Sequence, residues 1–239
     1  MKKLIILLCI VCFVGCKHQI RESATSIIKE QTAVPEMDNS DFVKITDVVP
    51  DVILEIRYFS TYNFVGDRID GYEAPVALLT KEAAQALKVA SDSLVAKGYR
   101  LKVFDAYRPQ TAVNHFIRWA EQVDDVRMKE YFYPNVDKSR LFELEFICAR
   151  SSHSRGSTVD LTLFDMNTER EVDMGCTFDW FGEESYPSYT NLTEEQLALR
   201  QTLRDAMMNA GFKPFTTEWW HFTLEDEPYP DTYFDFPVK

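Results

Sequence analysis

The sequence has no excess of positive charge, no long apolar run and few cysteines. Its 26 lysines and arginines are outnumbered by 38 aspartates and glutamates, which gives a formal net charge of −12. Such a chain repels phosphate backbones, so no nucleic-acid partner is expected. The apolar segment at residues 4–14 is too short to cross a bilayer as a stable helix. The five cysteines lack the spacing of a closed structural metal site.

The N-terminus has the pattern of an export signal. Lys2 and Lys3 precede the apolar segment, and Gly15-Cys16 follows it, which resembles a bacterial lipobox whose cysteine is lipidated. We therefore expect a lipoprotein-type signal peptide over residues 1–15 and a protein anchored by lipid on Cys16 at the periplasmic side of a bacterial membrane. The alternatives are an ordinary signal, which would release the protein into the periplasm, and an uncleaved anchor.

Composition divides the remaining chain into a polar tether, residues 16–41, and a folded domain, residues 42–239. Removal of residues 1–15 takes away two lysines and no acid, so the formal net charge becomes −14. Two cysteines then remain in the domain, Cys148 and Cys176. They could form a disulfide in an oxidising compartment or stay as two buried thiols, and the sequence leaves both possibilities open.

Capping residues and helical periodicity predict three helices. Thr80 is a suitable N-cap for a helix over residues 81–97, and Pro109 can open a second helix. Thr193-Glu194-Glu195-Gln196 has the pattern of a capping box at the start of a third.

Strand patterns are placed between these helices. The stretch Thr158–Leu163 alternates between apolar and polar residues, which predicts a half-buried strand with Asp160 on its polar face. Further strands are expected over residues 53–58 and 99–104 and from about Trp219. Without internal repeats, this mixture indicates a single α+β domain in which helices flank a mainly antiparallel central sheet.

Two short motifs carry the residues that could do chemistry. Residues 151–160 contain His153 and Asp160, and residues 217–221 contain Glu218 and His221. Two imidazoles and one carboxylate are a common ligand set for catalytic zinc, which keeps one coordination position open for water. The second carboxylate is then free to act as a general base. Each residue alone has a plainer interpretation, as a solvated acid or a hydrogen-bonded core histidine.

The spacing of these residues requires the chain to turn within both motifs. His153 and Asp160 would be about 23 Å apart in a fully extended chain, so the chain must fold back between them, and Gly156 gives that freedom. Glu218 and His221 would point to opposite faces of a regular strand. We therefore expect Glu218 at the end of a loop and His221 on the strand.

Arg108 is a candidate third participant. It lies in the run Asp105–Pro109, where a predicted strand ends and a helix begins. Its guanidinium could stabilise an oxyanion or hold a substrate carboxylate. The plainer interpretation is a surface ion pair with Asp105, which would contribute little.

Together the two motifs resemble those of the VanX-type zinc D-Ala-D-Ala dipeptidases, metallopeptidase family M15, subfamily D. The resemblance rests on Ser151-x-His153-x-x-Gly156-x-Thr158-x-Asp160 and Glu218-x-x-His221, and with the further matches it covers most of residues 50–224. Further matches are Arg57-Tyr58, Asn63-Phe64-x-Gly66, the run 105–109 and the run 160–163. Thr158 replaces an alanine that is usual in the family motif, a small change from which we expect little effect.

The resemblance implies a hedgehog-like or D,D-peptidase-like fold and one Zn²⁺ per chain on His153, Asp160 and His221. It also implies Glu218 as general base, Arg108 as transition-state stabiliser and Ser151 near the substrate. The expected activity is hydrolysis of the D-Ala-D-Ala dipeptide to free D-alanine. With an exported protein, this activity fits turnover of cell-wall peptides better than depletion of a cytosolic precursor pool.

Two other functions fit the same residues. A D,D-carboxypeptidase would trim longer wall peptides and needs an open groove on the amine side of the substrate. A lipid-anchored, zinc-containing binding module without turnover would have no use for Glu218. The expected partners are a small D-dipeptide and, through Cys16, a membrane; no protein partner is predicted.

Overall fold

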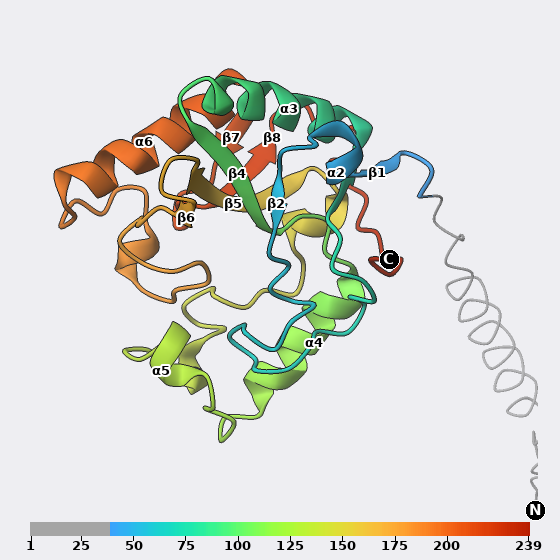
Figure 1. The fold of residues 1–239 in the computed structure, drawn as a ribbon. Helices are drawn as coiled ribbons and strands as arrows, with labels where there is room; N and C mark the ends of the chain where they lie inside the picture. Colours follow the sequence, from blue (N-terminus) through green and yellow to red (C-terminus); the bar gives the residue numbers. More distant parts are fainter. Residues whose placement is uncertain (1–38) are drawn as a thin grey trace, which may run out of the picture. The chain divides into compact units, whose positions relative to one another are not determined.

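The computed structural model describes residues 39–239 (Figure 1). The expected signal peptide at residues 1–15, the lipidated Cys16 and the tether up to residue 38 lie outside the described residues. Within the part that is described, no helix is both long enough and apolar enough to cross a membrane.

The described chain alternates between short strands and helices. The strands are β1 (Phe42–Lys44), β2 (Ile53–Leu54), β3 (Leu78–Thr80), β4 (Tyr99–Asp105), β5 (Thr158–Asp165), β6 (Arg170–Glu171), β7 (Phe212–Pro214) and β8 (His221–Leu224). The α-helices are α2 (Ile45–Val48), α3 (Lys81–Val95), α4 (Gln110–Glu121), α5 (Lys129–Phe132) and α6 (Glu194–Asn209). Three short 3-10 helices are η1 (Lys138–Arg140), η2 (Ser152–Arg155) and η3 (Glu183–Ser185).

The central sheet has the strand order β2-β4-β5-β8-β7, and β6 pairs with β5. The pairs β4–β5, β5–β8, β7–β8 and β5–β6 are antiparallel, but β2 and β4 are parallel. The α+β class is confirmed. The sheet is mainly antiparallel, as expected, but the one parallel pair makes it a mixed sheet and not a purely antiparallel one. The parallel pair arises because the chain between β2 and β4 makes a crossover that includes α3.

The expected helix starts are confirmed. Thr80 Oγ1 accepts a hydrogen bond from the Ala83 backbone N–H at the start of α3. Thr193 and Gln196 form the reciprocal bonds of a capping box at the start of α6. Pro109 lies directly before the first residue of α4. Local sequence signals therefore place each long helix to within one or two residues.

Helices α3 and α6 pack on each other and on the sheet, where α3 contacts β4, and α6 contacts β5 and β7. Figure 1 shows these two helices together on one side of the sheet and α4 on the other. The apolar face of β5, with Val159 and Leu161 fully buried, belongs to this core. Its polar face is buried as well, and Asp160 is only 2% exposed. The expectation of a half-buried strand is wrong because this face is covered too: Arg108 and His153 lie against Asp160.

The strand expected over residues 53–58 ends at Leu54. Beyond it the chain turns, and the buried side chain of Asn63 organises the turn. Its amide nitrogen donates to the backbone carbonyls of Arg57, Ser60 and Asp67. Its amide oxygen accepts from two further backbone N–H groups. The backbone N–H groups of Glu55 and Arg57 still donate to β4, so the Asn63 side chain satisfies the backbone groups of the turn that follows.

Candidate metal centre and catalytic cavity

Strand pairing places three acid or imidazole side chains in one row across the sheet. Asp160 on β5 lies opposite His221 on β8 and opposite Asp105 on β4. The register of β4 shifts between Val103 and Asp105, so two residues of β4 face one of β5. Such a bulge re-aims the side chain that follows it. Paired residues project from the same face of a sheet, so the row faces one side of the molecule.

His153 reaches this row from the short helix η2. Gly156 ends η2 in the left-handed conformation, with φ of +80°, and the chain then enters β5. A Cβ atom at this position would lie 2.3 Å from the Phe42 ring. Both this close contact and the positive φ therefore require glycine at position 156. The chain reversal expected at Gly156 is confirmed.

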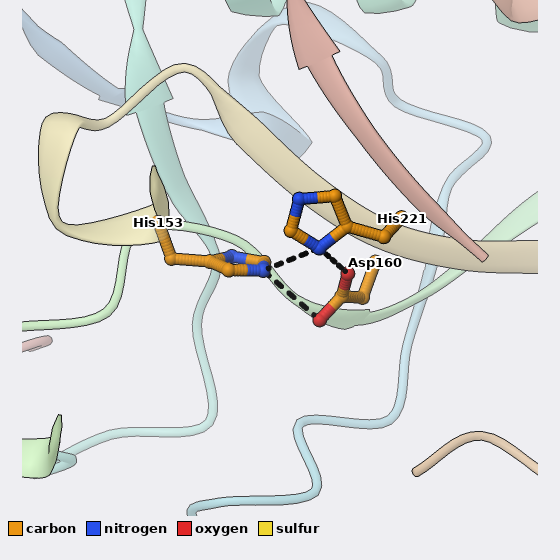
Figure 2. A group of neighbouring side chains, drawn as sticks. All are labelled: His153, Asp160 and His221. Carbon is orange, nitrogen blue, oxygen red and sulfur yellow. Dashed lines mark hydrogen bonds and ion pairs between the residues drawn. The ribbon is translucent and has the colours of Figure 1, made fainter. Parts of the chain in front are cut away.

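The side chains of His153, Asp160 and His221 converge (Figure 2). His153 Nε2 lies 3.1 Å from Asp160 Oδ2, and His221 Nδ1 lies 3.1 Å from Asp160 Oδ1. The two ring nitrogens are 3.3 Å apart. All three residues are buried, with at most 8% of their surface exposed. One ligand atom from each lies within 4.8 Å of the other two, as a shared metal ion requires.

The hydrogen bonds around the group fit a metal ion. His153 Nδ1 donates to the Ala106 carbonyl oxygen at 2.7 Å, which leaves the lone pair on Nε2 facing the group. His221 Nε2 lies 3.2 Å from Ser152 Oγ and can donate to it, which leaves Nδ1 free in the same way. Asp160 Oδ1 is buried and has no hydrogen-bond partner, although His221 Nδ1 is near. A cation would satisfy this oxygen and both nitrogens.

Attraction between the carboxylate and the imidazoles lowers the pKa of Asp160 and raises the pKa of His221. Burial would raise the pKa of Asp160, but His153 and His221 outweigh it and hold this pKa below its ordinary value. Burial would lower the pKa of His221, but the carboxylates of Asp160 and Glu218, which lie 3.1 Å and 3.3 Å from its Nδ1, raise it to about 9. In the metal-free protein His221 therefore carries a proton at neutral pH, which a metal ion must displace.

Glu218 lies at the end of the loop before β8, as expected. Residues 219–220 form a turn, so β8 begins at His221, two residues later than expected. Glu218 Oε2 is 3.3 Å from His221 Nδ1, and the side chain of Glu218 is 35% exposed. This carboxylate lies beside the three converging ligands and remains open to solvent.

Arg108 lies against the two aspartates of the row, Asp105 and Asp160. Its Nε donates to Asp105 Oδ2 at 2.9 Å, and its Nη2 lies 3.6 Å from Asp160 Oδ2. The Arg108 side chain is only 13% exposed and stacks over the Tyr58 ring. Burial would lower its pKa, but Tyr58, Asp105 and Asp160 keep it above the ordinary value. The ion pair with Asp105 exists, yet it is buried at the site and not a surface pair.

Ser151 connects the guanidinium to η2. Its Oγ accepts from the His153 backbone N–H at 3.3 Å and from Arg108 Nη1 at 3.5 Å. A cavity of about 390 Å³ joins these groups. All six residues singled out in the sequence line it: Arg108, Ser151, His153, Asp160, Glu218 and His221.

Sequence reasoning missed a second polar pair in this cavity, Tyr58 and Asp179. The Tyr58 hydroxyl donates to Asp179 Oδ2 at 3.0 Å, and both side chains are buried. Burial and the nearby Asp160 raise the pKa of Asp179 well above its ordinary value. Asp179 also has a φ of +61°. Its sequence neighbourhood gives no signal, because it is one acid among many in a loop.

The two cysteines of the domain are not joined. Cys148 is exposed and lines the cavity, and Cys176 is partly buried, where its sulfur accepts from the Trp219 indole N–H. Burial raises the pKa of both thiols. Both thiols are therefore free, as in one of the two possibilities left open by the sequence, but Cys148 is exposed and not buried.

Comparisons with known proteins agree on one family. The family model described as D-Ala-D-Ala dipeptidase, in the peptidase M15 group, matches residues 38–239. The D-alanyl-D-alanine dipeptidase of Enterococcus faecium is 40% identical over 198 residues, 83% of this chain and 98% of that protein. The one from Enterococcus faecalis is 41% identical over 203 residues, 85% of this chain and 100% of that protein.

One further relative and one solved structure are also similar to this chain. The D-alanyl-D-alanine dipeptidase of Streptomyces coelicolor is 39% identical over 198 residues, 83% of this chain and 98% of that protein. Among solved structures, the LdcB LD-carboxypeptidase aligns with a TM-score of 0.42 and 17% identity, over 81% of this chain and 72% of that one.

Proposed function

The chain belongs to the D-Ala-D-Ala dipeptidase family of peptidase M15, and we propose that it hydrolyses the D-Ala-D-Ala dipeptide at the His153, Asp160 and His221 group. The family makes it a metallopeptidase. The observation that carries the assignment of the site is the convergence of three buried ligand atoms beside a carboxylate that is not needed to hold a metal. Family membership also supports a D,D-peptidase-like fold for residues 42–239.

Zinc is the metal that the ligand types favour. The two imidazoles are borderline-soft donors and the carboxylate is a hard donor, a combination that suits Zn²⁺. Three protein ligands leave one coordination position of the ion open. Zinc bound there would lower the pKa of a bound water molecule and polarise the scissile carbonyl. One ion per chain is expected, because residues 39–239 contain a single group of this kind.

The chain's own residues would complete the reaction. Glu218 is placed to take the proton of the attacking water and to pass it to the leaving amine. Arg108 can donate hydrogen bonds to the carbonyl oxygen as negative charge develops on it. Asp105 fixes the direction of this guanidinium, and Ser151 holds its far side.

Asp179 is a candidate binder of the substrate ammonium. It is a buried carboxyl group in the cavity, and among the described residues only the Tyr58 hydroxyl donates hydrogen bonds to its side chain. Burial raises the pKa of Asp179 well above its ordinary value, and Arg108 offsets this only in part. An ammonium group would restore the charge and form a buried ion pair.

We expect Asp179→Asn to raise KM for D-Ala-D-Ala about 30-fold or more, because loss of one partner from a buried charge pair costs at least about 2 kcal/mol. Zinc content should stay at the wild-type level. Steady-state kinetics and metal analysis of the purified domain measure both quantities. An unchanged KM would remove Asp179 from substrate binding. The variant Asp173→Asn, which alters an acid outside the cavity, is a suitable control.

The proposed contact between Asp179 and the substrate ammonium distinguishes a dipeptidase from a carboxypeptidase. A dipeptidase must bind a free ammonium, whereas a D,D-carboxypeptidase acts where the substrate amine is part of a peptide bond. We therefore expect hydrolysis of D-Ala-D-Ala to exceed that of N-acetyl-D-Ala-D-Ala by at least 10-fold in kcat/KM, since the acetylated amine has no charge for Asp179. Faster release of D-alanine from the acetylated substrate would overturn the dipeptidase assignment.

We propose a location at the periplasmic side of a bacterial membrane, with the chain anchored by lipid on Cys16. The support is the order of charged, apolar and small residues at positions 1–16. In cells that make the full chain, a labelled fatty acid should enter the wild-type protein and be absent from Cys16→Ser. Equal labelling of both would exclude this anchor. A protein in this location would act on dipeptides released from the wall.

A further inference from the structure

A second cavity, of about 300 Å³, lies between α6 and the strands that follow it. Its apolar lining comes from two prolines, a leucine, a tryptophan and a phenylalanine, and its polar lining from α6. The lining residues are Pro187, Leu197, Arg200, Gln201, Arg204, Pro214, Trp219 and Phe222. None of them lines the catalytic cavity. The volume is at the small end of the range for ligand pockets.

The second cavity and the catalytic cavity share the segment 218–222 as a wall, and each is lined by different residues of it. Trp219 and Phe222 line the second cavity, whereas Glu218 and His221 line the first. Phe222 pairs with Val159 of β5 and shares its face, and His221 pairs with Asp160 on the opposite face. A molecule in the second cavity would therefore contact the segment that carries Glu218 without entering the catalytic cavity.

Among the polar groups of the second cavity, Arg204 is the one that could pair with an anion. The Arg200 guanidinium is not free to bind a ligand, because it donates hydrogen bonds to the backbone carbonyls of Met174, Glu184 and Tyr186. Gln201 donates to Asp205. Within residues 39–239 no ion pair or hydrogen bond is found for Arg204, which is half-buried. In a chain with 38 acids and 26 bases, a half-buried arginine without an acidic partner is a charge that a ligand can satisfy.

We propose that this second cavity binds a small aromatic carboxylate. The carboxylate would pair with Arg204, whose planar guanidinium suits a bidentate contact. The aromatic ring would lie among Pro187, Pro214 and the Trp219 indole, because flat rings bury a large area against such walls. This inference does not depend on the proposed hydrolysis.

Titration calorimetry with 4-phenylbutyrate tests the site. We expect saturable binding to the wild-type domain and at least 10-fold weaker binding to Arg204→Gln, because a charge-assisted contact is lost. The matched variant Arg118→Gln, on the exposed side of α4, should bind as the wild type does. Thermal unfolding of each variant shows that the fold is retained. Equal affinity of Arg204→Gln and wild type would overturn the proposal.

Three further comparisons identify the ligand class and the cavity. The uncharged 4-phenylbutyramide should bind at least 10-fold more weakly than the acid, and octanoate should bind more weakly than the aromatic acid. Equal binding of the amide would remove the role of charge, and equal or tighter binding of octanoate would remove the preference for an aromatic ring. Binding should persist in Arg108→Gln. Its loss there would place the probe in the catalytic cavity and refute the second site.

Discussion

The Glu218→Gln variant is expected to keep its zinc and to lose between about 100-fold and 10,000-fold in kcat for D-Ala-D-Ala, the range by which a positioned acid or base accelerates a reaction. Glutamine preserves the shape of the side chain but cannot accept the proton of the attacking water. The three ligands are left in place, and Glu218 is not among the converging group. Metal content should therefore equal that of the wild type.

Stopped assays of D-alanine release and metal analysis of the same preparation check this result. Glu225→Gln is the matched control, because Glu225 directly follows β8, is exposed and does not line the catalytic cavity. It should leave both activity and zinc unchanged. Wild-type activity in Glu218→Gln would exclude this carboxylate as the base. Loss of zinc in the variant would instead make Glu218 a ligand, which its position beside His221 Nδ1 also allows.

The same experiment addresses the binding module without turnover. A protein that only held zinc would gain nothing from an ionisable carboxylate 3.3 Å from a ligand nitrogen and 35% exposed at a cavity. Such a group adds negative charge next to a site that already contains one aspartate. A measurable rate that depends on Glu218 therefore separates the peptidase from the module.

Local features of the domain were predictable because few neighbouring residues decide them. Thr80 and Thr193 cap helices through bonds to N–H groups three residues away. Gly156 reverses the chain through its own backbone conformation. The spacing of His153 and Asp160 then shows that a reversal is needed. The residue types suggested that these two residues share a zinc site with His221, and the resemblance to a family assigned the three as its ligands.

Features that depend on contacts between segments far apart in the sequence could not be predicted from local patterns. The bulge that brings Asp105 into the row with Asp160 exists only when β4 pairs with β5. The polar face of β5 is buried in part by Arg108, which lies more than fifty residues before Asp160, so alternation alone suggested a half-buried strand. Asp179 becomes distinctive only through burial beside Tyr58. Functional sites are where such local rules are expected to fail.

The His221→Ala variant is expected to lose both zinc and activity. Loss of a partner that only orients a metal ligand lowers metal affinity about 10-fold to 100-fold, so loss of a ligand should exceed about 100-fold. His221 contributes the nitrogen that lies 3.1 Å from Asp160 and 3.3 Å from His153 Nε2. With alanine there, two side chains remain, and the open position that activates water is no longer defined.

Metal analysis after dialysis against a weak chelator, followed by the dipeptide assay, measures this result. His115→Ala is the matched control, because His115 lies on α4 near Asp70 and outside the catalytic cavity. It should retain zinc and activity. Thermal unfolding of metal-free wild type and metal-free His221→Ala separates loss of the metal from loss of the fold. A full equivalent of zinc in His221→Ala would show that the ion sits elsewhere, and the site built on Asp160 would then be abandoned.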